Sequence, residues 1–333
     1  MAAGKQGRRM SDRWECIVVG AGPAGLSAAL YMARYRRRVL VVHDGRTRAA
    51  RIPETHNVPG FPDGIEGPAL IARMAEHARR HGAEVREAEV RSAAREGATF
   101  VLELADGAPL QAESLILATG LHLNEPPLPH ARHEAAIRAG VLRYCPICDG
   151  FEHSGERIGV LGCDASGARE ALFLCQYSDD VTLLPMAMPE LTEAQRRALD
   201  AAGIVVESRP VASLDPHADR FEVRLEGDAR PLVFDVVYPA LGTRQRTELA
   251  AMLGLGLDEA GAVDARSPLG TEVPGLYCAG DIVDGLDQIS VAMGHGAVAA
   301  TRAHNWLRKR RGVRPSSSAA AARPAADPAG RSS

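Results

Sequence analysis

The sequence predicts an α/β protein built from two similar units, each with helices packed on a mainly parallel sheet. Hydrophobic residues make up 46% of the 333 residues and aromatic residues only 4%. Ala, Val and Leu must therefore form the core, which suits helices laid on parallel strands. The order strand, glycine turn, helix, strand begins at residue 15 and again at residue 157. At this length each unit can bury a core of its own.

The first unit is predicted from "ECIVVGAGPAGLSAALYMARY", in which an apolar run leads through a glycine turn into a helix. Leu26, Ala29, Leu30 and Ala33 share one face of that helix. The apolar run "RVLVVHDG" then predicts a second strand, which completes a βαβ unit. Further along we expect a helix over 68–80 and strands in "ATFVLEL" and "LQAESLILATG".

The second unit repeats this order after a predicted linker. The linker is "NEPPLPH", which has three prolines in four residues. "RIGVLGCDASGAREALFLCQY" predicts a strand, a turn and a helix, and "DDVTLLP" the strand that follows. The last segment, "GLYCAGDIVDGLDQISVAMGHGAVAATRAHNWL", predicts a strand, a turn and a long helix.

Charge and chain ends point to a cytoplasmic protein without a nucleic-acid or membrane partner. The net charge is −3, which gives no electrostatic case for either surface. The start, "MAAGKQGRRMSDRW", lacks the apolar stretch of a signal peptide, and Met10 is an alternative first residue. No apolar run reaches the roughly 18 residues of a membrane span. We expect residues 1–11 to be flexible and the Pro/Ala/Ser-rich tail 312–333 to be disordered.

The first glycine turn predicts a dinucleotide site. In "GAGPAG", Gly20 permits the tight turn, Gly22 lets a pyrophosphate approach the backbone, and Gly25 lets helix and strand pack closely. The N–H groups of the helix start then face the anion. The acid expected at the end of the second strand falls at His43 or Asp44, so either Asp44 reaches the ribose or that contact is weakened.

The second glycine turn is altered. In "GCDASG", Gly162 and Gly167 are present, but Asp164 occupies the position where a pyrophosphate would approach. Like charges about 4 Å apart repel by roughly 1 kcal/mol in water and by several times more in a desolvated site. The following strand ends in "TLLPMAMPE", with no Arg or Lys before Arg196. We expect this unit to keep its shape and to bind a nicotinamide nucleotide poorly; an Arg supplied from elsewhere in the fold is the alternative.

The pair Cys145 and Cys148, followed by Asp149, has three interpretations: half of a zinc site, a redox dithiol, or two buried thiols. Zinc needs further ligands, and the nearest candidates are His153 and Cys163. A redox dithiol explains the spacing better, because a helix start, expected at "DG" directly behind the pair, favours a thiolate and Asp149 can move the proton. The other four cysteines, Cys16, Cys163, Cys175 and Cys278, are predicted to be small buried residues.

Over roughly residues 14–310 the chain resembles the low-molecular-weight thioredoxin reductases. The motifs that carry the resemblance stand in the family's order: "GAGPAG", "HNVPGFP", "LILATG", "CPICDGFE", and "YCAGD" followed by "QISVAMGHG". The resemblance implies a homodimer and two Rossmann-like three-layer domains. An FAD-binding domain (12–124 and 250–311) is then split by an inserted NAD(P)-binding-like domain (125–249) that carries the cysteines.

The resemblance also implies residue roles. Cys148 would lie against the flavin, Cys145 would exchange with the substrate, and Asp149 would donate the proton. FAD contacts are implied at Gly20, Gly22, Pro23, Ala24, Gly25, Asp44, Asn57, Thr119, Gly120, Gly280, Asp281, Gln288 and Ile289. His295 would lie near the flavin, where it either tunes the cofactor or caps a helix.

The function predicted from this resemblance is that of an FAD-dependent thiol–disulfide oxidoreductase. Its partner would be a thioredoxin-like protein or a small dithiol or disulfide, with the direction of electron flow open. Because the family's NADPH site has a fuller glycine turn and a basic cluster, the use of NADPH or NADH is doubtful. The alternatives are a dithiol oxidase that uses O2, a ferredoxin-linked disulfide reductase and a flavin-binding sensor without turnover.

Overall fold

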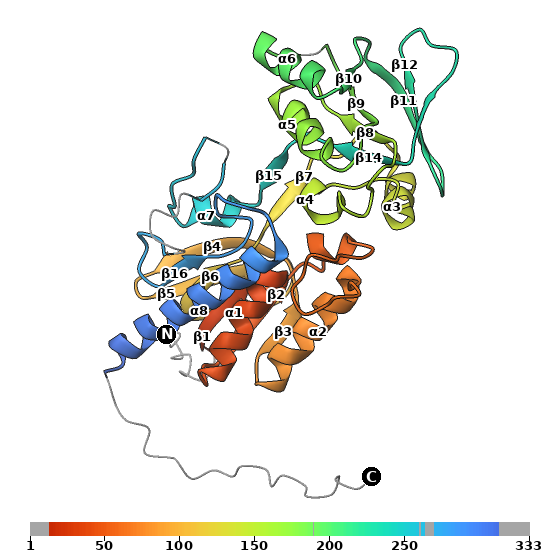
Figure 1. Cartoon of the computed structure of the whole chain (residues 1–333). Coiled ribbons are helices and arrows are strands. Elements are labelled where there is room, and N and C mark those ends of the chain that lie inside the picture. Colours follow the sequence, from red (N-terminus) through yellow and green to blue (C-terminus); the bar gives the residue numbers. More distant parts are fainter. Residues whose placement is uncertain (1–12, 189, 260, 264–269, 313–333) are drawn as a thin grey trace, which may run out of the picture.

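The computed structural model describes residues 13–188, 190–259, 261–263 and 270–312. The predicted flexible start (1–11) and residues 313–333 of the predicted disordered tail lie outside these ranges. Figure 1 shows two lobes connected through two strands, β7 (Leu121–Leu123) and β15 (Thr243–Gln245), which pair with each other antiparallel.

The first lobe is built on a seven-stranded sheet. Its order is β3-β2-β1-β6-β5-β4, and β16 pairs with β6. The strands are β1 (Arg13–Val19), β2 (Val39–His43), β3 (Glu84–Glu87), β4 (Val90–Glu96), β5 (Thr99–Leu104), β6 (Leu110–Leu117) and β16 (Leu276–Cys278). The pairs that join β3, β2, β1, β6 and β16 are parallel, and those that join β4, β5 and β6 are antiparallel. Because β16 follows the second lobe in sequence, the chain leaves this sheet and returns to it.

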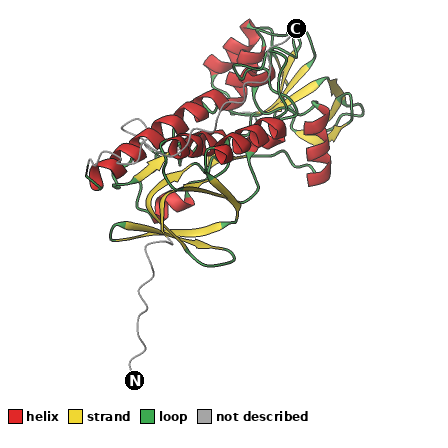
Figure 2. Ribbon diagram, turned by 90° about the horizontal axis from the view of Figure 1, so that it is seen from below, coloured by secondary structure: helices red, strands yellow, loops and turns green. Residues whose placement is uncertain are grey.

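Helices of the first lobe cover this sheet, and Figure 2 shows helices and strands in separate layers. They are α1 (Pro23–Arg34), the 3-10 helix η2 (Arg48–Arg51), α2 (Gly67–Arg80), α7 (Glu248–Met252) and α8 (Ile289–Arg310). α1 and α8 lie side by side (Figure 1). None of the described helices, α8 included, is long and apolar enough to cross a membrane.

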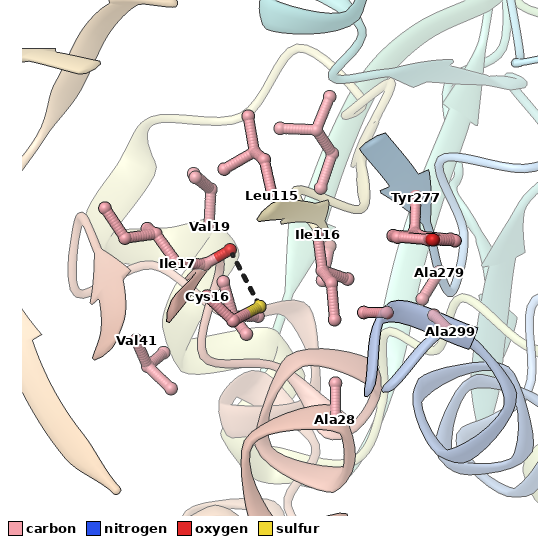
Figure 3. Packing of buried hydrophobic residues seen from close by; sticks show 14 of the residues in the cluster. Cys16, Ile17, Val19, Ala28, Val41, Leu115, Ile116, Tyr277, Ala279 and Ala299 are labelled. Atoms are coloured by element: carbon pink, nitrogen blue, oxygen red, sulfur yellow. Dashed lines mark hydrogen bonds between the residues drawn. The ribbon is translucent and has the colours of Figure 1, made fainter. Parts of the chain in front are cut away.

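The core of the first lobe consists mainly of aliphatic side chains between the sheet and the paired helices. Figure 3 shows Ile17 and Ile116 from the strands close to Ala28 of α1 and Ala299 of α8. The alanines let the two helices approach closely, and Ser27 Oγ donates to the carbonyl of Met293 across the contact at 2.8 Å. Small residues in the helices therefore fix the distance between α1 and α8.

The second lobe contains a smaller parallel sheet in the order β10-β9-β8-β14. These strands are β8 (Ile158–Leu161), β9 (Val181–Leu184), β10 (Val205–Val206) and β14 (Val236–Pro239). The helices are α3 (His130–Ala139), α4 (Pro146–Asp149), α5 (Ala165–Leu174) and α6 (Glu193–Ala201). An antiparallel ribbon completes the lobe: β11 (Val211–Pro216), β12 (Phe221–Leu225) and β13 (Leu232–Phe234). The predicted α/β fold with two Rossmann-like units is therefore confirmed.

The domain limits 12–124, 125–249 and 250–311 stay a prediction. The contacts nearest the second crossing are informative, because Leu249 and Ala250 on α7 are both buried in the core of the first lobe. The chain therefore rejoins that core directly after β15.

The close approach of α8 to α1 gives a direct test. A Cβ at Gly296 would lie 2.1 Å from the carbonyl oxygen of Ala24, so Gly296→Ala should lower the free energy of unfolding by about 1–3 kcal/mol. Gly294 is the matched control, because no atom lies within 4 Å of the position that a Cβ would take there. Gly294→Ala should raise stability by roughly 0.5–1 kcal/mol. Urea denaturation of both variants measures the difference, and an equal effect of the two substitutions would contradict this packing.

Candidate active site

A cavity of about 400 Å³ lies beside the carboxyl ends of β1, β2 and β6. Ligands of open α/β sheets bind at this edge. Most of the predicted cofactor residues line the cavity: Gly20, Gly22, Pro23, Ala24, Asp44, Thr119, Gly120, Gly280, Asp281, Gln288 and Ile289. Gly25 and Asn57 lie outside its wall.

The first glycine turn leaves the start of α1 open toward this cavity. Gly20 has φ +110°, and a Cβ there would lie 2.1 Å from the carbonyl oxygen of Ala118. A Cβ at Gly25 would lie 1.9 Å from the carbonyl oxygen of Gly20, so Gly25 serves helix packing. Gly22 precedes the helix, and among the described residues no side chain caps it. The first N–H groups of α1 can therefore bind an anion.

The second glycine turn also leads from a strand into a helix, but here backbone N–H groups at the start of the helix donate to a side chain of the protein itself. Asp164 is the N-cap of α5, and its Oδ1 accepts from the N–H groups of Ser166 at 2.9 Å and Gly167 at 3.2 Å. The carboxylate therefore occupies the position that the sequence assigned to a pyrophosphate. Pro185 and Met186 follow β9, so no charged side chain stands directly at its end.

Cys145 and Cys148 form a disulfide at the single-turn helix α4. Cys145 is the N-cap and Pro146 is the first helical residue. The expectation that a helix starts at Asp149 and Gly150 is wrong, because α4 already ends there, with Asp149 as its last residue and Gly150 as its C-cap. Cys148 lines the cavity of the first lobe, so the disulfide of the second lobe lies at that cavity.

Gln288 connects the disulfide to the cavity wall. Its Nε2 lies 3.4 Å from Cys145 Sγ and 3.6 Å from Cys148 Sγ. Its Oε1 accepts from Asn57 Nδ2 at 3.0 Å, and Asn57 Oδ1 accepts from Thr55 Oγ1 at 3.0 Å. Oε1 also lies 3.7 Å from Cys148 Sγ, but the disulfide sulfurs carry no hydrogen, so the Gln288 amide can form a hydrogen bond to them only through Nε2. An N–H donor therefore points at both sulfur atoms.

Asp149 is 7% exposed and its two carboxylate oxygens are bound by different side chains. Tyr238, fully buried on β14, donates to Oδ1 at 2.7 Å, and Arg143 Nε donates to Oδ2 at 2.5 Å. Burial, together with the charge of Asp149, raises the pKa of Tyr238, so this phenol keeps its proton. The carboxylate thus ties α4 to the sheet of its own lobe.

A second set of contacts holds the two lobes together near the disulfide. Arg51 of η2 reaches across to Glu134 at 2.6 Å and to Glu125 at 2.8 Å. Burial alone would raise the pKa of Glu134. The hydrogen bond from Arg51 has the larger effect, so the pKa of this carboxyl is lowered. Next to this pair, His133 shares a 2.6 Å hydrogen bond with the hydroxyl of Tyr144, the residue before Cys145. The arrangement joins the lobes beside the redox pair.

Other predicted residues have different surroundings from those expected. His43 accepts from the N–H of Gly45, and Asp44 is ion-paired with Arg46 and Arg246. His295 lies inside α8, whose N-cap is Gln288, so capping by His295 is wrong. Its Nδ1 is buried without a hydrogen-bond partner among the described residues. Burial lowers the pKa of His295, which keeps the ring neutral near neutral pH.

The remaining cysteines are only partly as expected. Cys16 and Cys278 are fully buried, and burial raises the pKa of each thiol to about 12, so they stay protonated. Figure 3 shows Cys16 within the core, with its thiol close to the carbonyl of Ile17. Cys163 and Cys175 are half-buried, so the prediction of burial is wrong for these two.

Sequence reasoning missed several polar residues of the cavity wall. Arg48 pairs with Asp281 at 3.2 Å and donates to the carbonyl of Asp287 at 2.8 Å. Burial, and then the charge of Asp281, raises the pKa of Asp287 to about 6. Arg246 and His122 line the same cavity. Arg246 and His122 come from segments without a motif. For Arg48 the sequence signal is the density of Arg after the second strand, in "DGRTRAAR".

Comparisons with known proteins agree with this geometry. Residues 14–296 match the model of the pyridine nucleotide-disulphide oxidoreductase family. A thioredoxin reductase of Streptomyces clavuligerus is 32% identical over 310 residues, which cover 90% of this chain and 95% of that protein. A bifunctional thioredoxin reductase/thioredoxin of Mycobacterium leprae (strain TN) is 32% identical over 310 residues, covering 90% of this chain and 67% of that protein.

Two solved structures extend the comparison. HlmI has a TM-score of 0.82 and 32% sequence identity, covering 91% of this chain and 95% of its own. The thioredoxin reductase from Streptococcus pyogenes MGAS5005 has a TM-score of 0.80, covers 89% of this chain and 98% of its own, and at 23% identity supports the fold alone.

A disulfide set against a cavity below an open glycine turn defines a disulfide oxidoreductase of the two-lobed α/β type. The chain belongs to the pyridine nucleotide-disulphide oxidoreductase family. Within that family it is similar over nearly its whole length to thioredoxin reductases, so the predicted resemblance is confirmed, and it is a flavin-dependent disulfide oxidoreductase.

The contact of Arg51 with α3 predicts a measurable coupling between the lobes. Arg51→Gln should increase amide hydrogen exchange over 48–57 and 130–137 about fivefold, because the partly exposed ion pairs contribute roughly 1 kcal/mol. Arg132→Gln is the matched control, since Arg132 lies on α3 and pairs with Asp215 within the second lobe, so this change should leave exchange over 48–57 unaltered. Mass spectrometry after exchange measures both. Unchanged exchange in Arg51→Gln would show that these ion pairs do not join the lobes.

Proposed function

We propose that this protein is an FAD-dependent thiol–disulfide oxidoreductase that passes electron pairs between the flavin, the Cys145–Cys148 pair and an external dithiol or disulfide. One observation carries the proposal: the Nε2 of Gln288, on the cavity wall, faces both sulfurs of a disulfide that belongs to the other lobe. A purely structural disulfide has no need of a cavity and an oriented donor beside it.

The residues of the cavity fit FAD. The uncapped start of α1 offers N–H groups to a pyrophosphate, and Gly22 has only Thr47 Oγ1, at 3.4 Å, near the position of a side chain. Gly20, Gly22, Asp281 and Gln288 would hold the cofactor along the cavity. When bound, FAD supplies two-electron exchange with the dithiol.

The thiol chemistry follows from the placement of the two sulfurs. An external thiolate attacks Cys145 Sγ, the Cys145–Cys148 bond breaks, and its electron pair leaves on Cys148 as a thiolate. The second external thiolate attacks the external sulfur of the mixed disulfide, which frees Cys145 and leaves the external pair oxidised. Two electrons enter the cysteine pair, and the two external thiols lose their protons. The reverse sequence reduces an external disulfide with the same bonds.

Gln288 and Asp149 assist this exchange in different ways. The Nε2–H group of Gln288 stabilises the thiolate of Cys148 as it forms. Asp149 is bound by Arg143 and Tyr238, so it anchors α4 in this arrangement. Service as the proton donor, as the family resemblance implies, requires release of one of these two contacts.

We further propose that electrons do not come from NADPH or NADH through the second lobe. Asp164 already caps the helix start where a pyrophosphate would bind, and uncharged residues follow β9. Oxidation of a dithiol with O2 as the acceptor, or supply by reduced ferredoxin, then completes the cycle. The capped helix is the observation that favours this second candidate over a reductase driven by a nicotinamide nucleotide.

A thioredoxin-like protein and a small dithiol are the two proposed classes of partner. The Mycobacterium leprae relative is named as a fusion of reductase and thioredoxin, which supports a protein partner. Ile147, between the cysteines, is 48% exposed and Phe151 is 75% exposed, which offers apolar contact to either class. We also propose a homodimer in the cytoplasm, on the family resemblance alone.

The cysteine pair is tested by replacement. Cys145→Ser and Cys148→Ser should each lower the rate of flavin-coupled dithiol oxidation at least a hundredfold, because each removes one sulfur of the exchange. Cys175→Ser is the control, because Cys175 is the half-buried C-cap of α5 and should not affect the rate. Flavin absorbance after anaerobic mixing with dithiothreitol measures the rate. If Cys145→Ser and Cys148→Ser both react at the wild-type rate, the disulfide has no catalytic role.

The nucleotide proposal is tested on the same holoprotein. NADPH and NADH at micromolar concentration should leave the flavin oxidised during the time in which a dithiol bleaches it fully, since Asp164 blocks the anion site. Anaerobic stopped-flow absorbance follows both reactions. Rapid bleaching by NADPH would overturn this proposal and leave the thiol chemistry intact.

A further inference from the structure

The ribose end of the cofactor cavity differs from the arrangement that its glycine turn predicts. In a βαβ dinucleotide site the acid at the end of the second strand accepts a hydrogen bond from a ribose hydroxyl. Here Asp44 directly follows β2 and lines the cavity, but its carboxylate is already bound by cations. The side chain is 12% exposed. Three of about four acceptor positions of the usual ribose acceptor are therefore used within the protein.

Arg246 is the partner that comes from far along the chain. Its Nη2 lies 2.5 Å from Asp44 Oδ2, across 202 residues of sequence. Arg46 adds contacts from its backbone N–H to Oδ1 at 3.0 Å and from its Nε to Oδ2 at 3.2 Å. Burial alone would raise the pKa of Asp44. The hydrogen bonds from Arg246 and Arg46 outweigh this effect, so the pKa of Asp44 is lower than that of a free Asp. Asp44 is thus a bound carboxylate at neutral pH.

The wall of the cavity itself fixes the position of Arg246. Its backbone N–H donates to the carbonyl of Gly120 at 2.9 Å, and its carbonyl accepts from Thr119 Oγ1 at 2.6 Å. The adjacent pairing of β15 with β7 sets this register. Arg246 lines the cavity and its side chain is 24% exposed. A guanidinium has five N–H donors in a fixed plane, so one bond to Asp44 leaves donors for a ligand beside it.

We infer that Arg246 binds the adenosine half of the dinucleotide cofactor, with Asp44 holding the guanidinium in place. The ligand class is an adenosine phosphate: its ribose hydroxyls and phosphate oxygens are acceptors that a guanidinium can bind at the β2 end of the cavity. This inference rests on the proposed FAD site. It adds a contact for the adenosine half from Arg246, which directly follows β15 and stands outside the glycine-turn motif.

The inference separates FAD from FMN, since FMN lacks the adenosine half. The full chain, stripped of cofactor by dialysis, is titrated with FAD and with FMN by quenching of flavin fluorescence. Arg246→Gln should raise the Kd for FAD at least tenfold and change the Kd for FMN less than twofold. Arg246→Lys keeps the charge and should recover part of the loss. Arg244→Gln is the matched control, because Arg244 stands two residues away and pairs with exposed Glu248.

Asp44→Asn distinguishes positioning from direct binding. If Asp44 acts through Arg246, the double variant binds FAD no more weakly than Arg246→Gln alone. Additive losses would assign the ribose to Asp44 and contradict the inference, as would an unchanged Kd for FAD in Arg246→Gln or an equal loss of FAD and FMN. A wild-type chain that binds neither flavin would instead contradict the proposed function, so the two failures are distinguishable.

Discussion

The contact of Gln288 with the two sulfurs is the constraint on which the rest of the site depends. Gln288 is the N-cap of α8, and α8 packs along α1, the helix that begins at the open glycine turn. Asn57 donates to the amide oxygen of Gln288, and the amide N–H group faces the disulfide. The packing of two helices in the first lobe therefore determines where a thiolate of the second lobe is stabilised. Arg51, which also contacts the second lobe, keeps the lobes close enough for this contact.

The two glycine turns of the chain show how one residue changes the use of a shared fold. Both turns lead from a parallel strand into a helix, and both keep the glycines that packing requires. At α1 the helix start faces a cavity, whereas at α5 the carboxylate of Asp164 binds the same N–H groups. At α5 two of the N–H donors that could bind a phosphate are used within the protein, and the charge of Asp164 opposes the helix dipole that would attract one. Under our proposal that no nicotinamide nucleotide binds there, the second lobe serves to carry the disulfide.

The sequence allowed the local features to be predicted and left the long-range ones open. The glycine turn around Gly20, the strand and helix order, and the cysteine pair depend on residues close in sequence, so pattern and spacing revealed them. The pairs Arg51–Glu134, Arg246–Asp44 and Asn57–Gln288 span 83, 202 and 231 residues, and no periodicity marks them. Asp164 was predicted to repel a phosphate, and the structure adds the capping bonds that make it a substitute for one.

The central claim is that the flavin and the disulfide form one electron-exchanging unit. Anaerobic photoreduction of the holoprotein, with the electrons counted against flavin absorbance, tests this most directly. The account predicts that each chain takes up two electrons for the flavin and two more for the cysteine pair before the flavin band is lost completely, and that a Cys145→Ser/Cys148→Ser protein takes up only the first two. Equal uptake by the two proteins would contradict it, because the disulfide would then be electrically isolated from the flavin.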